Sequence, residues 1–207
     1  ELYNSDSIDA VYIATTHNFH YEQTLACLQH GKAVLCEKPI TVNQRQFEEL
    51  AKVAKEKNVF LMEAMWTYFL PAILKAKQWI AEGRIGSVKA LQADFGFSME
   101  FNPEGRLYNI KLAGGALLDL GIYPIAFANL FMNRNPDSIM AAKTQLKAFV
   151  YGDKGYIEVP MFFKAPEASL YNEEMQLAET FKDSRSTHGY NFETQEVTDC
   201  LLKGLTE

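Results

Sequence analysis

Residues 8–39 read IDAVYIATTHNFHYEQTLACLQHGKAVLCEKP, and this stretch decides the expected fold of the chain. Residues 8–14 are a short apolar run rich in strand-forming residues, which is typical of a strand buried on both faces. Residues 19–30 then carry apolar side chains at helical spacing, and Gly31 is a natural helix stop. Residues 33–36 follow as a second short strand.

The same pattern continues in the next part of the chain. Thr41 or Asn43 can cap a helix with apolar residues over 47–54, and residues 59–62 read as a third strand. Strand–helix–strand repeats with short connections predict a parallel sheet with right-handed crossovers. Ligands of such sheets bind beyond the carboxyl ends of the strands. In this sequence those ends are residues 15–18, 37–39 and 63–66.

The second half of the chain follows a different pattern. Its expected strands are joined without intervening helices, which predicts an antiparallel sheet. A hairpin is expected over residues 148–159, because Gly152 and Gly155 frame a tight turn. Elsewhere we expect helices over residues 70–82, 115–132 and 191–204, a strand over 87–97, a loop over 101–113 and irregular polar chain over 164–190.

The predicted fold class is therefore α/β, with a domain boundary near residue 64. It combines a partial Rossmann-type parallel sheet with a C-terminal α+β domain whose sheet is open and mainly antiparallel. We find no internal repeat and no low-complexity tract in the sequence.

The composition argues against several classes of protein. Of the 207 residues, 48% are hydrophobic and 22% are charged, so the chain can bury a core and is not expected to be disordered. The net charge of −6, without a cluster of Lys and Arg, argues against a nucleic-acid partner. No apolar run is expected to reach the roughly 18–20 residues of a membrane helix, so no membrane partner is expected.

Cysteines and histidines indicate no disulfide framework and no metal site. Cys27, Cys36 and Cys200 lack zinc-type spacing, and their odd number argues against paired disulfides. We therefore expect a reducing, cytoplasmic setting, and no secretory leader opens the chain. The four histidines form no cluster with acids or cysteines. The chain opens at Glu1 instead of Met, as expected of a fragment or of joined segments.

Lys38 is the first candidate for chemistry. It stands between Glu37 and Pro39 at the end of the second expected strand, at the mouth of the sheet. A lysine in that place can stabilise a developing alkoxide electrostatically. The alternative is an exposed loop lysine beside a turn proline, and the short motif alone does not distinguish the two.

Asp119 and Tyr123 are the second candidates. They stand four residues apart, so they share a face if the segment is helical. A tyrosine hydroxyl can pass a proton to or from a substrate oxygen, and a neighbouring lysine cation favours its ionised form. Asp119 could bind a sugar-like hydroxyl or orient Tyr123. The alternative is a half-buried core tyrosine and a solvated helix acid.

The loop Thr16-His17-Asn18 and the nearby His20 are the third candidates. Asn18 can cap the following helix, and a helix start also favours an anion or the polar edge of a cofactor. A lone histidine has many structural uses, so His20 could pack or cap instead of taking part in chemistry.

Taken together, these segments resemble the Gfo/Idh/MocA family, named after glucose–fructose oxidoreductase and inositol dehydrogenase. The resemblance begins with residues 8–15 (IDAVYIAT), 18–22 (NFHYE) and 31–39 (GKAVLCEKP). Four later segments are similar to the branch of the dimeric dihydrodiol dehydrogenases and glucose–fructose oxidoreductase. They are residues 63–67 (EAMWT), 83–86 (GRIG), 114–124 (GGALLDLGIYP) and 152–160 (GDKGYIEVP).

The resemblance implies a Rossmann domain for NAD or NADP over residues 1–64, without its N-terminal glycine loop. It implies a substrate-binding and dimerisation domain over residues 65–207, in a homodimer or a higher homo-oligomer. The implied reaction is hydride transfer between nicotinamide and a carbon of a sugar, polyol, cyclitol or dihydrodiol. Tyr123 would donate and accept the proton, Lys38 would assist, and Asp119 would orient the substrate. The implied cofactor-binding residues are Thr15, Thr16, Asn18, His20, Glu37, Lys38, Trp66 and Arg106.

The chain also departs from the family pattern. No G-x-G-x-x-G motif occurs, so we expect weak or no cofactor binding if these residues are the whole polypeptide, and the choice between NAD and NADP cannot be read. Between Ile139 and Ala148 the family pattern would hold more strands, and the last family helix is missing after Glu207. Tyr68 stands where the branch often has Arg as a substrate anchor. A non-catalytic protein on the same fold, which senses a dinucleotide or binds a partner, is the alternative function.

Overall fold

The computed structural model describes residues 2–132 and 146–206. The chain forms two compact units. The described parts of the first unit are residues 2–65, 100–122 and 193–206, and those of the second are residues 66–99, 123–132 and 146–192. The extra strands that the family pattern would place between Ile139 and Ala148 fall mainly outside the described residues.

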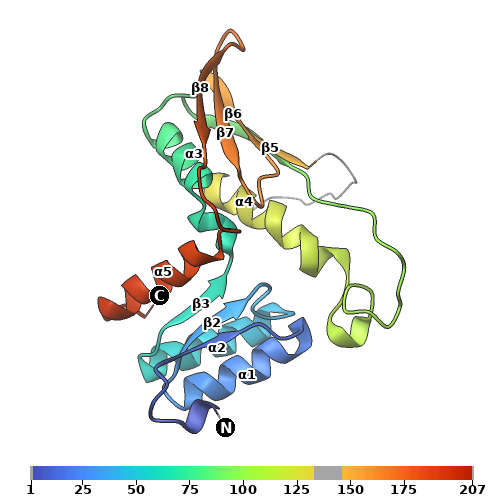
Figure 1. The fold of residues 1–207 in the computed structure, drawn as a ribbon, viewed down its shortest axis with the longest axis vertical. Coiled ribbons are helices and arrows are strands. Elements are labelled where there is room, and N and C mark those ends of the chain that lie inside the picture. The colour runs from blue at the N-terminus through green and yellow to red at the C-terminus, as the bar shows by residue number, and fades with distance from the viewer. Residues whose placement is uncertain (1, 133–145, 207) are drawn as a thin grey trace. The chain divides into compact units, whose positions relative to one another are not determined.

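A parallel sheet of three strands, in the order β1–β2–β3, forms the centre of the first unit (Figure 1). Its strands are β1 (Ala10–Ile13), β2 (Ala33–Glu37) and β3 (Leu61–Ala64). Ile13 pairs with Cys36, and Cys36 pairs with Glu63, so the carboxyl ends of the three strands lie side by side. This confirms the predicted Rossmann-type sheet and brings the polar loops after the strands to one edge.

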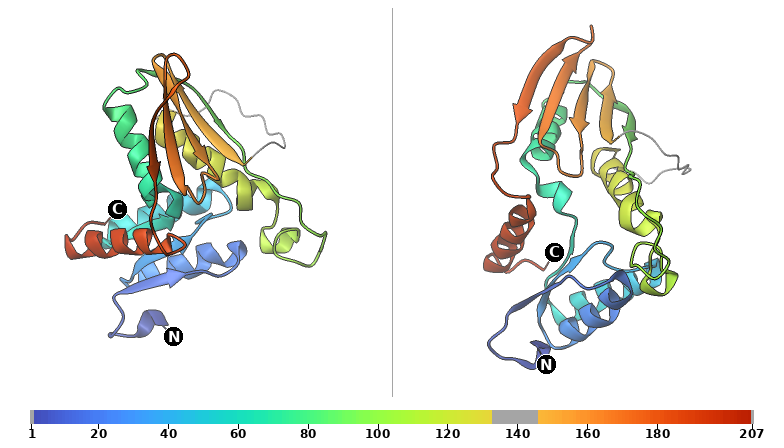
Figure 2. Two further views of the ribbon diagram at one scale, coloured as in Figure 1. Left: turned by 45° about the horizontal axis from the view of Figure 1, so that its top comes forward. Right: turned by 45° about the vertical axis from the view of Figure 1, so that its right-hand side comes forward.

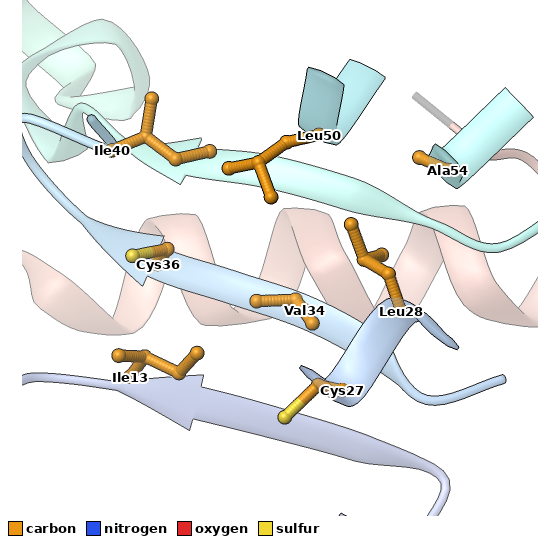
Figure 3. Packing of buried hydrophobic residues seen from close by; sticks show 8 residues of the cluster. All are labelled: Ile13, Cys27, Leu28, Val34, Cys36, Ile40, Leu50 and Ala54. Atoms are coloured by element: carbon orange, nitrogen blue, oxygen red, sulfur yellow. The ribbon is translucent and has the colours of Figure 1, made fainter. Parts of the chain in front are cut away.

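Helices cover both faces of this sheet. The helices α1 (His17–Gln29) and α2 (Gln44–Lys57) contribute to the core on one face, and α5 (Tyr190–Leu202) contributes to the core on the other. Because side chains alternate along a strand, Val34 and Cys36 of β2 face α1 and α2, whereas Ala33 and Leu35 face α5. Figure 3 shows Val34 and Cys36 beside the helical residues of the first core.

The two predicted helix caps differ in outcome. The side chain of Asn43 accepts a hydrogen bond from the backbone N–H of Gln46 at 3.1 Å, which confirms it as the cap of α2. The prediction for Asn18 is wrong, because α1 begins at His17 and Asn18 lies inside its first turn. There Asn18 accepts a hydrogen bond from the hydroxyl of Thr16 at 2.7 Å.

The second unit contains an antiparallel sheet of five strands in sequence order. Its hairpin is formed by β5 (Lys147–Gly152) and β6 (Gly155–Pro160), as predicted. The expectation of irregular chain over residues 164–190 is wrong, because two of the strands lie there. The remaining strands are β4 (Val88–Ala93), β7 (Glu167–Asn172) and β8 (Leu177–Lys182).

Two helices cover one face of the five-stranded sheet. They are α3 (Pro71–Ala81) and α4 (Ile122–Met132), and both views in Figure 2 place them on the same side of the strands. The buried sheet residues are Ala148, Val150, Ile157, Val159, Ala168 and Leu170. The side chains that alternate with them form the opposite face, which carries a row of aromatic rings, Phe149, Tyr151, Tyr156 and Tyr171.

A long apolar stretch, Ile110–Met132, ends in α4. Its length and its mean hydropathy of 1.5 suffice for one membrane span by length and composition only, so the expectation that no apolar run is long enough is wrong. The stretch contains Lys111 and a π-helical turn (Leu117–Gly121) that carries the buried Asp119. An ionisable residue such as Asp119 is costly inside a bilayer. Core helices of soluble proteins can reach the same length and hydropathy.

Removing the side chain of Leu50 tests the core between α2 and the parallel sheet. Leu50 is fully buried, so we expect Leu50→Ala to lower the free energy of unfolding by about 2–5 kcal/mol. Phe47 on the same helix is 46% exposed, and Phe47→Ala should cost less than about 1 kcal/mol. Urea unfolding followed by circular dichroism measures both. Equal losses for the two variants would contradict this packing.

Candidate active site

Two cationic side chains meet on the carboxylate of Asp119 in the first unit. Lys38 follows β2, Asp119 lies in the π-helical turn, and Arg106 lies in the loop before it. The Nζ atom of Lys38 donates to the backbone oxygen of Asp119 at 2.7 Å and lies 3.3 Å from its Oδ1 atom. The Nη1 atom of Arg106 lies 3.2 Å from the same Oδ1 atom.

The charge of Asp119 is held by these two cations. Burial by itself raises the pKa of Asp119, but Lys38 and Arg106 outweigh it and hold the pKa below its ordinary value. The side chains of Lys38 and Asp119 are only 11% and 12% exposed, whereas that of Arg106 is 56% exposed. The arrangement is a shielded ion pair with one cation at its solvent side, so the solvated helix acid considered for Asp119 is excluded.

A glycine shapes the backbone around this ion pair. A side chain at Gly114 would place its Cβ atom 2.7 Å from the backbone oxygen of Arg106 and 2.9 Å from that of Asn109. Gly114 thus lets the chain before the π-helical turn pass close to the loop of Arg106. Hydrogen bonds in a π-helical turn span five residues instead of the four of an α-helix, and such turns are frequent at functional sites.

His17 contacts the same carboxylate from α1. Its Nδ1 atom lies 3.2 Å from the backbone oxygen of Ala113, and its Nε2 atom lies 3.9 Å from Oδ1 of Asp119. Burial lowers the pKa of His17, and Lys38 adds to this effect, while the Ala113 oxygen and Asp119 oppose it. The sequence placed His17 in a polar loop but did not indicate this contact, because Ala113 and Asp119 are distant in the chain.

His20 holds two backbone segments together. The ring is fully buried, with Nδ1 at 2.8 Å from the backbone oxygen of Pro39 and Nε2 at 3.1 Å from that of Thr15. The packing role considered for His20 is therefore present, and its predicted part in cofactor binding stays a prediction.

Three other polar residues at this sheet edge, Thr15, Glu37 and Glu63, form hydrogen bonds within the first unit. The hydroxyl of Thr15 donates to Gln23 at 2.9 Å. Glu37 accepts hydrogen bonds from the hydroxyl of Tyr12 and from the backbone N–H of Lys38. Glu63, at the carboxyl end of β3, accepts from the backbone N–H of Ile40 at 2.8 Å, and burial raises its pKa.

Tyr123 and Trp66 form a second group, which lies in the second unit. The indole Nε1 atom of Trp66 donates to the phenolic oxygen of Tyr123 at 2.9 Å. Tyr123 is 8% exposed and packs edge-on against Phe95, with ring centroids 5.1 Å apart. Trp66 is also buried, and its ring stacks on that of Tyr190 at 4.7 Å. Both aromatic residues are thus held by neighbours on more than one side.

Tyr68, at the position where the family branch often has a substrate-anchoring Arg, forms a hydrogen bond within the second unit. The hydroxyl of Tyr68 donates to the backbone oxygen of Ala126 at 3.0 Å. This contact connects the short helix Trp66–Phe69 to α4 within the second unit.

The structure thus brings Lys38, Asp119 and Arg106 together in one unit, and Tyr123 and Trp66 together in the other. Sequence reasoning placed His17 in a candidate loop without indicating its contact with Asp119, and it did not single out Glu63 or Glu193. The sequence signal for Glu63 is its place near the end of the third expected strand, beside the strand that precedes Lys38.

Glu193 is a buried carboxyl in the first turn of α5. It is 1% exposed, and neither carboxyl oxygen has a hydrogen-bond partner among the described residues. Burial raises the pKa of Glu193 from 4.5 to about 8, and the negative charge of Glu37 adds to the effect. Its signal in the sequence is faint, since the neighbouring residues on α5 are also polar.

The cysteines and possible metal ligands add no further centre. Cys27, Cys36 and Cys200 are free and buried. Within residues 2–132 and 146–206, no three side chains of His, Cys, Asp or Glu are grouped to hold a metal ion.

Two family models match the chain. Residues 1–65 match the model described as oxidoreductase family, NAD-binding Rossmann fold. Residues 73–159 match the model of the GFO/IDH/MocA C-terminal domain.

Curated and solved relatives agree with these matches. Trans-1,2-dihydrobenzene-1,2-diol dehydrogenase of Xenopus laevis is 32% identical, and the match covers 100% of this chain and 74% of that protein. D-xylose 1-dehydrogenase (NADP(+)) of Hypocrea jecorina is 42% identical over 61% of this chain and 34% of its own length. A levoglucosan dehydrogenase solved with NADH and levoglucosan has a TM-score of 0.80 at 17% identity, covering 98% of this chain and 73% of its own.

Replacing Glu193 tests its buried, uncharged state. Because its pKa is raised in the folded protein, its contribution to stability is present below pH 4.5 and is lost as the pH rises towards 8. Glu193→Gln cannot ionise, so its stability relative to the wild type should increase by roughly 2–4 kcal/mol between pH 5 and pH 9.

Thermal and urea unfolding across this pH range measure the difference. Glu196→Gln, an exposed change on the same helix, is the matched control and should show no such trend. A constant difference between Glu193→Gln and the wild type would contradict the raised pKa.

Proposed function

This chain belongs to the Gfo/Idh/MocA family of NAD(P)-dependent oxidoreductases, and from that premise we propose its reaction and the residues that carry it. The proposed reaction is hydride transfer between NAD(P) and a hydroxyl-bearing carbon of a sugar, polyol, cyclitol or dihydrodiol. Tyr123 is the proposed proton donor and acceptor, and Lys38 assists it.

The hydrogen bond between Trp66 and Tyr123 is the observation that carries this proposal. The indole N–H donates to the phenolic oxygen at 2.9 Å in a buried aromatic setting. A donor aimed at this oxygen stabilises the negative charge that develops when Tyr123 gives up its proton. In the oxidation direction the same oxygen takes the proton of the substrate hydroxyl.

Lys38 and Asp119 have complementary parts in the proposal. The ammonium group of Lys38 supplies positive charge where a substrate alkoxide forms. Asp119 holds Lys38 by two contacts, and its carboxylate is kept ionised, so it can also accept a hydrogen bond from a substrate hydroxyl. Arg106, on the solvent side of Asp119, is a second donor for substrate or cofactor oxygens.

The edge of the parallel sheet suits the nicotinamide half of NAD(P). Donors and acceptors gather at the carboxyl ends of its strands, where ligands of open α/β sheets bind. Thr15, Thr16, Asn18 and Glu37 would contact ribose hydroxyls and the carboxamide, beside Lys38. When bound, NAD(P) accepts or supplies the hydride.

The names of the relatives support the substrate class. They include a dehydrogenase of dihydrobenzene diol and a D-xylose dehydrogenase that uses NADP(+). A structural neighbour was solved with NADH and levoglucosan. We propose that this chain takes a vicinal diol or a sugar of similar size.

Residues 1–64 are proposed as the C-terminal part of the dinucleotide-binding domain, and residues 65–207 as the substrate-binding and dimerisation domain. The match of residues 1–65 to the Rossmann model supports the first assignment. Three free buried cysteines suit the proposed cytoplasmic setting.

The open face of the antiparallel sheet is the proposed contact between two copies of the chain. Phe149, Tyr151, Tyr156 and Tyr171 are all partly exposed there. The rings of Tyr156 and Tyr171 stack at 4.5 Å. A contiguous aromatic face of this kind marks an interaction site on a folded protein.

Tyr123→Phe tests the proposed proton transfer. The change removes only the hydroxyl group, so it should lower kcat by about 100-fold or more. The affinity for NADH and NADPH should stay within about two-fold of the wild type, because the cofactor residues are unchanged. Turnover on D-xylose and trans-1,2-dihydrobenzene-1,2-diol, together with fluorescence titration of the two cofactors, measures both quantities.

Tyr21→Phe is the matched control for this test. It removes a hydroxyl that donates to Glu49 on the surface of the first unit, at 2.7 Å, and should leave kcat unchanged. Unchanged turnover of Tyr123→Phe would remove Tyr123 from the reaction. Cofactor binding without turnover on any polyol would favour a dinucleotide sensor.

Tyr156→Lys tests the proposed contact between copies. A charge in the middle of the aromatic row should convert a dimer or larger oligomer into monomers. Size-exclusion chromatography with light scattering measures the mass, and Phe47→Lys, at another exposed aromatic residue, is the control. A monomeric wild type, or an unchanged oligomer in Tyr156→Lys, would contradict the proposed interface.

A further inference from the structure

The backbone around Lys38 is held by side chains from three elements of the first unit. His20 comes from α1, Glu37 from β2, and Glu63 from β3. We propose that His20 and Glu63 are positioning residues, which fix the segment Lys38–Ile40 and thereby the place of the Lys38 ammonium group. The inference rests on the proposed role of Lys38 and adds two residues that act through it.

Glu63 holds the segment from the side of β3. Its Oε1 atom accepts the backbone N–H of Ile40 at 2.8 Å, two residues after Lys38. The side chain of Ile40 is 6% exposed and belongs to the core between α1, α2 and the sheet. A carboxylate acceptor for a backbone N–H is one of the stronger hydrogen bonds in proteins, so Glu63 is suited to fix this position.

His20 holds the segment from the side of α1. Its Nδ1 atom lies 2.8 Å from the backbone oxygen of Pro39, and its Nε2 atom lies 3.1 Å from the backbone oxygen of Thr15. Both partners are acceptors, and a neutral imidazole carries one N–H, so the ring donates to one of these oxygens and packs against the other, between the loop after β1 and the segment after β2. The ring is fully buried, which leaves no solvent to replace these contacts.

The three contacts act on successive residues of the chain. Glu37 accepts the N–H of Lys38, His20 contacts the oxygen of Pro39, and Glu63 accepts the N–H of Ile40. These three contacts are made to the backbone, whereas the ammonium group of Lys38 contacts Asp119 on the π-helical turn. The backbone contacts and the ion pair thus hold the two ends of the lysine side chain separately.

Such support matters because a lysine side chain is long and flexible. Its four-carbon stem loses considerable rotamer freedom when the ammonium group is fixed, and the ion pair with Asp119 restrains only the far end. A displacement of about 1 Å at a reacting group can cost on the order of 100-fold in rate. Loosening the backbone at Ile40 or Pro39 should therefore appear in kcat more than in KM.

The first experiment compares two changes at Glu63 in the full-length enzyme, with NAD(P)+ and trans-1,2-dihydrobenzene-1,2-diol or D-xylose as the probes. Glu63→Leu removes the acceptor for Ile40 and should lower kcat by about 10- to 100-fold, with KM for cofactor and substrate within about three-fold. Glu63→Gln keeps an oxygen acceptor and should retain kcat within about three-fold. Glu56→Leu, at an exposed acid of α2, is the control. A wild-type kcat in Glu63→Leu would overturn the inference.

A double-mutant cycle separates positioning from general structural support. Lys38→Met removes the ammonium group, so Glu63→Leu in that background should change the residual rate by less than about two-fold. Additive losses would show that Glu63 acts independently of Lys38 and would overturn the inference. If Lys38→Met alone leaves kcat unchanged, it is the proposed role of Lys38 that fails.

Amide hydrogen exchange gives a readout that does not depend on activity. In NMR spectra, the N–H of Ile40 should lose protection at least ten-fold in Glu63→Leu and keep it in Glu63→Gln and Glu56→Leu. Equal protection of Ile40 in all variants would overturn the proposed contact. Should Glu63→Leu fail to fold, His20→Gln takes its place in the cycle with Lys38→Met, where additive losses would again overturn the inference.

Discussion

The burial of β2 on both faces is the constraint on which the first unit depends. Four successive residues of this strand are at most 6% exposed, and they alternate between the core with α1 and α2 and the core with α5. A strand buried on both faces is typical of a covered parallel sheet, and β2 is the central strand of this one. Parallel pairing with β1 and β3 then brings the three strand ends to one edge. Lys38 stands at this edge because it directly follows the strand whose register is specified by burial on both sides.

Asp119 organises the charges at this edge. A carboxylate that is largely withdrawn from water is costly unless cations or hydrogen bonds compensate it, and here Lys38 and Arg106 supply the compensation. The same pairing restrains the Lys38 ammonium group and orders the π-helical turn that leads into α4. Asp119 therefore connects a residue of the parallel sheet with a segment more than 80 positions later in the chain. Clusters of compensated, shielded charges are characteristic of functional sites, which agrees with the family membership of the chain.

Local signals in the sequence predicted most of the helices and strands, but they did not predict contacts between segments that are distant in the chain. Asn43 caps α2, and Gly152 and Gly155 frame the β5–β6 hairpin, because capping and tight turns depend on adjacent residues. The strand β8 was missed because it is an edge strand with mostly exposed residues and little apolar alternation, and β7 was missed although Ala168 and Leu170 alternate as buried residues along it. Among the candidate residues, Lys38, Asp119 and Tyr123 were singled out through short motifs in a characteristic order. The contacts of His17 and Glu63 were not predicted, since their partners Ala113, Asp119 and Ile40 are identified only by proximity in space.

The sequence by itself determined that a parallel sheet is followed by an antiparallel one, the family resemblance, and Lys38, Asp119 and Tyr123 as candidates for chemistry. These properties follow from local periodicity, from caps and turns, and from motifs read in order along the chain. Only the tertiary structure decided how those residues are used: that Asp119 is shielded and paired with two cations, that Trp66 donates to Tyr123, and that His20 and Glu63 hold the backbone near Lys38. The reason is physical. Hydrogen bonding, burial and charge compensation depend on distances of a few ångströms between groups, and folding sets these distances between residues that are far apart in the sequence.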